Sequence, residues 1–143
     1  MKVGSRGHYG ILALAELANN YQSRRPIQVK EIAANQKIPP EYLGQIMVVL
    51  NRAGLVHGAR GPGGGYVLAR PPEQITVKEA LEILEGPLVG MDLRLKKNGS
   101  GSQTTQRFVE IWARGIVALE SVLAESTLAD LCSPEQRAYM YYI

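Results

Sequence analysis

A glycine-rich stretch at residues 60–66, Arg-Gly-Pro-Gly-Gly-Gly-Tyr, restricts the fold of this chain more than any other feature. Glycine reaches positive φ angles at little cost, so four glycines in seven residues favour a tight turn. Short apolar runs lie on both sides, at 55–59 and 66–68, and each has the length of a strand. The stretch therefore predicts a β-hairpin with a glycine tip. Taken alone, it is also compatible with a merely flexible hairpin.

The sequence ahead of the hairpin predicts three helices. Apolar residues recur at spacings of three and four over 9–21, with Ser5 as the expected N-cap. A short helix follows at 30–36, and a third begins at Pro40 and ends before Gly54. Helix, tight turn, helix and hairpin, in this order, are typical of a winged helix-turn-helix. The expected fold class is mainly α with a small β wing.

The charge is distributed unevenly along the chain. Residues 1–70 carry nine basic and three acidic side chains, whereas residues 71–143 carry seven basic and ten acidic ones. A basic half attracts polyanions, and nucleic acid is the commonest polyanion that proteins bind. The alternative is a basic face that only contacts solvent.

Composition excludes several classes of protein. A single cysteine rules out a disulfide framework within the chain, and no apolar run approaches the roughly 20 residues of a membrane span. We see no signal peptide, so we expect a cytoplasmic protein. The chain also lacks the patterns of a nucleophile, a general base or a metal site, so we expect no enzyme, no cofactor and no metal.

The second half predicts a long helix that joins two copies of the chain. Thr76 and Glu79 form a capping-box pattern ahead of a helix at 77–85, and a polar loop precedes a long helix at 105–125. This helix could pack on the first one, but a palindromic site needs a two-fold protein, so we favour a homodimer. A stripe at heptad spacing is the expected dimerisation surface: Phe108, Ile111, Trp112, Gly115, Leu119 and Val122.

These elements give three expected regions. Residues 1–86 form the winged helix-turn-helix DNA-binding region, 87–106 a flexible loop, and 107–143 the dimerisation helix with a C-terminal tail. Arg60 is expected to contact DNA from the wing, and Glu41 and Gln45 to face base edges from the second helix of the motif. The full set of expected DNA contacts is Lys2, Arg6, Lys37, Glu41, Tyr42, Gln45, Arg52, Arg60, Gly61, Gly63, Gly64 and Gly65.

Several motifs together resemble the Rrf2 family of bacterial winged-helix regulators. The matching stretches are Ser-Arg-Gly-His-Tyr-Gly at 5–10, Tyr-Leu-Gly-Gln at 42–45, Ala-Gly-Leu-Val at 53–56, the glycine-rich 60–66, Ile-Thr-Val at 75–77, Leu-Glu-Gly at 84–86, Trp112, and Thr-Leu-Ala-Asp-Leu at 127–131. They cover nearly the whole chain in order. The resemblance implies a DNA-binding regulator that dimerises through its long helix.

Two departures from the family pattern matter. Cluster-binding members carry three cysteines in the loop before the long helix, but residues 91–106 have none and the lone Cys132 follows that helix. The resemblance therefore argues against iron–sulfur sensing, although a redox- or iron-sensing regulator with unusual ligands stays open as an alternative. Gly44 stands where those members have a glutamate that helps to discriminate DNA sites, so the base preference should differ.

The end of the chain is similar to that of the CymR-type repressors of cysteine metabolism within this family. Residues 135–143 contain three tyrosines and end in Ile143. The resemblance implies a repressor whose tail, with Tyr142 and Ile143 as binding residues, docks in cysteine synthase. Two alternatives remain: the tail packs on the body of the protein, or the chain is chiefly a module that binds this enzyme.

Overall fold

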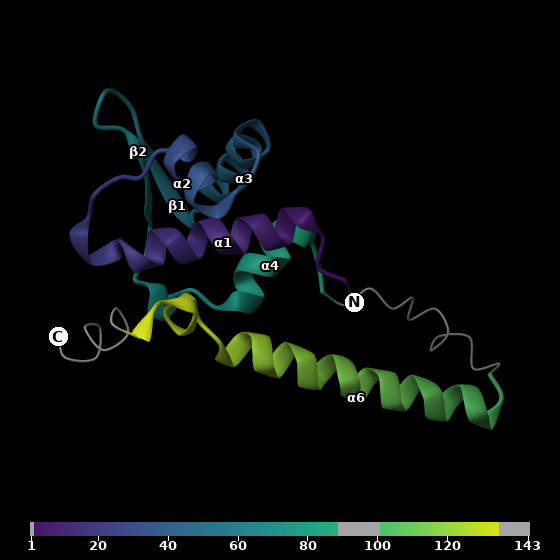
Figure 1. Cartoon of the computed structure of the whole chain (residues 1–143). Helices are drawn as coiled ribbons and strands as arrows, with labels where there is room; N and C mark the ends of the chain where they lie inside the picture. Colours follow the sequence, from purple (N-terminus) through teal and green to yellow (C-terminus); the bar gives the residue numbers. More distant parts are fainter. Residues whose placement is uncertain (1, 89–100, 135–143) are drawn as a thin grey trace.

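The computed structural model describes residues 2–88 and 101–134. Its elements are α1 (Ser5–Asn19), α2 (Val29–Gln36), α3 (Pro40–Arg52), β1 (Val56–Ala59), β2 (Gly65–Leu68), α4 (Val77–Glu85) and α6 (Gln103–Glu125), with the short 3₁₀ helices η1 (Tyr21–Ser23), η2 (Pro72–Gln74) and η3 (Leu128–Leu131). Helix α1 runs through the middle of the molecule, with α2, α3 and the hairpin on one side and α4 and α6 on the other (Figure 1). The expected fold class is confirmed.

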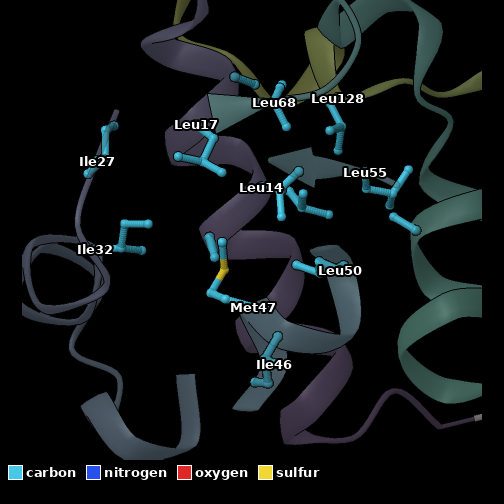
Figure 2. Close-up of a cluster of buried hydrophobic side chains, with 14 of the residues drawn as sticks. Leu14, Leu17, Ile27, Ile32, Ile46, Met47, Leu50, Leu55, Leu68 and Leu128 are labelled. Carbon is cyan, nitrogen blue, oxygen red and sulfur yellow. The ribbon is translucent and has the colours of Figure 1, made fainter. Parts of the chain in front are cut away.

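The core forms around the buried side of α1. Leu14 is fully buried and lies among Met47 and Leu50 of α3 and Leu55 at the start of the hairpin (Figure 2). Leu128, from beyond α6, is also fully buried in this cluster. Burying large aliphatic side chains supplies most of the folding free energy, at about 1.5–3 kcal/mol each. The core therefore holds the helix-turn-helix and the wing in one rigid unit.

The two strands pair antiparallel, as the sequence predicts, with Val56 opposite Leu68 and Ala59 opposite Gly65. Ile27 extends this sheet on the other edge of β2. Its N–H donates to the Tyr66 carbonyl at 2.9 Å, and its carbonyl accepts from the Tyr66 N–H at 2.8 Å. Gly65 has a φ of +140°, and a Cβ there would lie 2.6 Å from the Ile27 carbonyl carbon. Only glycine fits this position without displacing the neighbouring backbone.

Helix α1 begins earlier than the sequence predicts, at Ser5 instead of residue 9, and its N-cap is Gly4 rather than Ser5. The reason is a cap from another element. The Glu85 carboxylate at the end of α4 accepts from the backbone N–H groups of Gly4 at 2.9 Å and Gly7 at 2.8 Å. Single-sequence periodicity contains no sign of such a distant acceptor. Backbone N–H groups in the first turn, which have no partner inside the helix, thereby find an acceptor far along the chain.

Helix α4 has the predicted bounds, and the Thr76 hydroxyl accepts from the Glu79 N–H at 3.0 Å. The Glu79 carboxylate pairs with Arg70 at the base of the wing instead of completing a capping box.

Helix α6 begins at Gln103, inside the loop expected to end at 106, because the Ser102 hydroxyl accepts from the Thr105 N–H at 3.2 Å.

The chain beyond α6 returns to the core. The Leu128 N–H donates to the Ile75 carbonyl at 2.9 Å, and the Val77 N–H donates to the Ser126 carbonyl at 2.8 Å. Within the expected dimerisation helix and tail, 107–143, the short helix η3 thus packs against η2 and α1 of its own chain. In the part of the chain that the structure describes, no helix is long and apolar enough to cross a membrane.

Candidate nucleic-acid interface

Helix α3 presents one exposed stripe opposite its buried face. Leu43, Ile46, Met47 and Leu50 point into the core. Four exposed residues recur every three or four positions, as expected for one face of a helix: Glu41, Gln45, Val48 and Arg52. Three of these four are residues that we predicted to contact DNA. The fourth, Val48, was missed, although its spacing from Gln45 and Arg52 places it on the same face.

Helix α2 is fixed on α1 by a buried carboxylate. Glu16 is 8% exposed and accepts from the side-chain amides of Asn35 at 2.6 Å and Gln36 at 2.9 Å. Lys37 follows in the left-handed region, with a φ of 56°, and makes the tight turn into α3. Glu16 was not among the predicted residues, although a charge inside the apolar stripe of α1 is a signal in the sequence. These contacts hold the end of α2 against α1, and Lys37 is exposed in the turn that follows.

The N-terminus of α1 lies beside the first turn of α3. The Tyr42 hydroxyl and the Ser5 hydroxyl are 3.5 Å apart, and the rings of Tyr42 and Tyr9 meet edge to face at 5.9 Å between centroids. Lys2 and Arg6 are exposed at this end of α1. Arg6, next to Ser5, is therefore near the start of α3, whereas Lys2 lies in the arm before α1 and lines a cavity together with Glu85 and Trp112.

The tip of the wing combines an exposed cation with a turn shaped by glycine. Arg60 is exposed, and Gly61 has a φ of +99°. The Gly64 N–H donates to the Gly61 carbonyl at 2.9 Å, and Gly64 is buried. Its N–H is therefore used inside the turn and is not available to a phosphate, although Gly64 is one of the expected DNA contacts. Gly61 and Gly63 remain exposed.

One basic residue of the N-terminal half, Arg25, is paired with a carboxylate. Arg25 donates two hydrogen bonds to the Glu31 carboxylate, at 3.0 and 3.3 Å. These hydrogen bonds lower the pKa of Glu31 below its ordinary value. Arg25 thus forms an ion pair with a residue of α2. The predicted contact residues Arg52 and Arg60 have exposed side chains, at the end of the recognition helix α3 and at the wing.

Metal-binding groups do not gather in the described part of the chain, where no three His, Cys, Asp or Glu side chains are placed to hold an ion. Cys132 is buried, and its thiol donates to the Leu128 carbonyl at 3.5 Å. His8 and His57 lie on the surface of α1 and β1. The predicted tail residues Tyr142 and Ile143 lie outside the described residues.

The predicted dimerisation stripe of α6 is largely uncovered by its own chain. Phe108 is 55% exposed, Ile111 65%, Trp112 41% and Val122 60%. Val109 is the buried residue of α6, and the helix packs on α4. Gly115 is exposed, and a Cβ there would meet nothing within 4 Å. A contiguous stripe of exposed apolar side chains usually marks a surface that a partner covers.

A cavity of about 500 Å³ adjoins the stripe. It lies between the N-terminal arm, the end of α4 and the middle of α6. The stripe residues Trp112, Gly115 and Leu119 form part of its wall, and Leu81 and Ile116 form another part. Part of the stripe therefore borders a hollow that α6 shares with α4 and the N-terminal arm.

Comparisons with known proteins agree with this arrangement. Residues 3–134 match the model of the Rrf2 family, described as an iron-dependent transcriptional regulator. The chain is 36% identical to the HTH-type transcriptional regulator CymR of Bacillus subtilis, with all of both chains covered. A solved structure of CymR, the global cysteine regulator of B. subtilis, has a TM-score of 0.79 at 34% identity, over 92% of this chain and 95% of that one. IscR of T. potens has a TM-score of 0.72 at 34% identity, over 99% and 97%.

Proposed function

Because the chain belongs to the Rrf2 family of helix-turn-helix transcriptional regulators, we propose that it is a repressor that binds palindromic operators as a homodimer. The observation that carries this proposal is the separation of two surfaces. Helix α3 and the wing lie on one side of α1 and α6 lies on the other (Figure 1), and both α3 and α6 carry exposed side chains. Such an arrangement lets two copies join while both recognition helices stay free for DNA.

The shape and chemistry of α6 support a second copy as the partner of the stripe. Aromatic and aliphatic side chains at heptad spacing are the usual surface of a helix pair, and Gly115 lets another helix approach closely. Isologous contacts bring the same stripe from each protomer together. The cavity beside Trp112 gives a bulky side chain of the second copy a place to insert.

We assign DNA contacts to three clusters. Lys2 and Arg6 extend from the start of α1, the exposed face of α3 enters the major groove, and Arg60 with Gly61 and Gly63 follows the backbone or the minor groove. Lys37, in the turn before α3, and Arg52, at the end of α3, pair with phosphates. Gly64 and Gly65 shape the turn that carries Arg60.

The regulated genes that we propose are those of cysteine metabolism. The support is the 36% identity over the full length to CymR, whose solved structure is titled as that of a global cysteine regulator. We also propose that the tail with Tyr142 and Ile143 binds cysteine synthase, on the resemblance of 135–143 to CymR-type ends. Calorimetry with that enzyme tests this point: the full chain should bind, and a chain lacking the last two residues should not.

The operator experiment is an in vitro selection of duplex DNA followed by gel shifts. We expect the selected sequences to be palindromic, and a duplex with one scrambled half-site to bind at least tenfold more weakly. Each mismatch in a specific site costs about 1–3 kcal/mol. If selection yields no shared sequence, or one half-site binds as tightly as two, the proposal is wrong.

A further inference from the structure

Val48 is a large apolar side chain exposed on the recognition helix. It is 42% exposed and stands between Gln45 and Arg52 on the face of α3 that points away from the core. The two preceding residues, Ile46 and Met47, point into the core and are buried. Val48 does not belong to the core cluster, so core packing does not explain an apolar residue at this position.

An exposed valine is unfavourable on two grounds. Its methyl groups meet water, and a β-branched side chain loses rotamer freedom in a helix. Gly44 lies one turn earlier on the same face, and a Cβ there would meet nothing within 4 Å. The surface beside Val48 is thus open, and the helix backbone at Gly44 can come close to a partner. Together these two residues form an apolar notch between polar neighbours.

The major groove of DNA offers one apolar group at base edges, the C5-methyl of thymine. We propose that Val48 contacts a thymine methyl in each operator half-site and so determines which base is preferred there. This inference rests on the proposed function, because it needs α3 to lie in the groove. Gln45 and Arg52 are polar and lie on either side of Val48. They then hold the helix in the groove by hydrogen bonds and phosphate contacts.

The test replaces thymine by deoxyuridine, which removes only the methyl group. Each thymine of the selected operator is replaced in turn, in both half-sites, and affinity is measured by fluorescence anisotropy at fixed salt. For the unaltered protein we expect one symmetric pair of thymines to matter, with a loss of about fourfold per half-site, the factor for one buried methyl group. The Val48→Ala protein should not distinguish deoxyuridine from thymine at that pair.

Val117→Ala is the matched control, because Val117 is also an exposed helical valine, 62% exposed on α6. Both substitutions raise helix propensity, so neither variant should unfold. We expect Val117→Ala to keep the thymine preference of the unaltered protein. If Val48→Ala keeps it too, or if no thymine pair responds, the inference is wrong while operator binding stands. Absence of operator binding by the unaltered protein would instead refute the proposed function.

Discussion

The carboxylate of Glu85 accepts a hydrogen bond of 2.8 Å from the backbone N–H of Gly7, which joins the end of α4 to the start of α1. A Cβ at position 7 would lie 2.5 Å from the same carboxylate oxygen, so the contact needs glycine there. Helix α4 also packs on α6. Helix α1, which carries Arg6, is therefore connected through α4 to the expected dimerisation helix.

Replacing Glu85 by alanine should destabilise the fold. Loss of an N-terminal cap and of a negative charge near the helix N-terminus costs about 1–2 kcal/mol. Urea unfolding at a fixed protein concentration measures this change. Glu85→Gln should lose less, because its amide oxygen can still accept from Gly4 and Gly7. The control is Glu73→Ala, at an exposed carboxylate of η2. Equal stability of Glu85→Ala and Glu73→Ala would contradict a capping role.

Gly65 and Gly63 should respond differently to alanine. Gly65 has a positive φ, and a Cβ there would meet the Ile27 backbone, whereas a Cβ at Gly63 meets nothing within 4 Å. We expect Gly65→Ala to lower the free energy of unfolding by about 1–3 kcal/mol and Gly63→Ala to change it by less than about 0.5 kcal/mol. Thermal unfolding of both variants checks this. Similar melting temperatures would show that the turn is not fixed by Gly65.

Much of this fold is predictable from local patterns. The hairpin, the turn into α3 and the bounds of α4 follow from glycine, proline and apolar spacing at residues such as Pro40 and Gly54. The start of α1 does not, because its cap comes from Glu85, 78 residues after Gly7. The return of Leu128 into the core is missed for the same reason. Contacts between distant residues leave no periodic signal in a single sequence.

Arg60→Ala should weaken operator binding without changing stability. Arg60 is exposed at the wing, and loss of such a contact costs about 1–3 kcal/mol of binding free energy. Gel shifts at constant ionic strength measure the change, since phosphate contacts depend on salt. Arg114→Ala, at an exposed arginine of α6, is the matched control. Unchanged affinity of Arg60→Ala would remove the wing from the interface.

The candidate DNA surface was predictable in outline because recognition-helix residues follow the period of a helix. Glu41, Gln45 and Arg52 lie where that period places them, on the exposed side. The glycines of the wing were harder to assign. Gly64 and Gly63 are alike in sequence, but the hydrogen bond of Gly64 inside the turn distinguishes them. Only the three-dimensional structure shows which glycine N–H groups already donate a hydrogen bond inside the turn.

Trp112→Glu should convert the protein to a monomer. A carboxylate in the middle of the apolar stripe would lose its hydration in a helix pair without gaining a partner. Val117 lies about two and a half turns after Phe108, on the opposite face of α6, and is 62% exposed. Val117→Glu should therefore leave association intact. Sedimentation equilibrium of both variants distinguishes them, and equal masses would place the interface elsewhere.

The central claim is that two copies of this chain hold one operator through recognition helices on one side and α6 on the other. The most direct measurement is the mass of the complex with a selected palindromic duplex, by native mass spectrometry. We predict two protomers per duplex for the unaltered protein and for Val117→Glu, and weak single-protomer binding for Trp112→Glu. One protomer per duplex in the unaltered protein, or two in Trp112→Glu, would contradict the account.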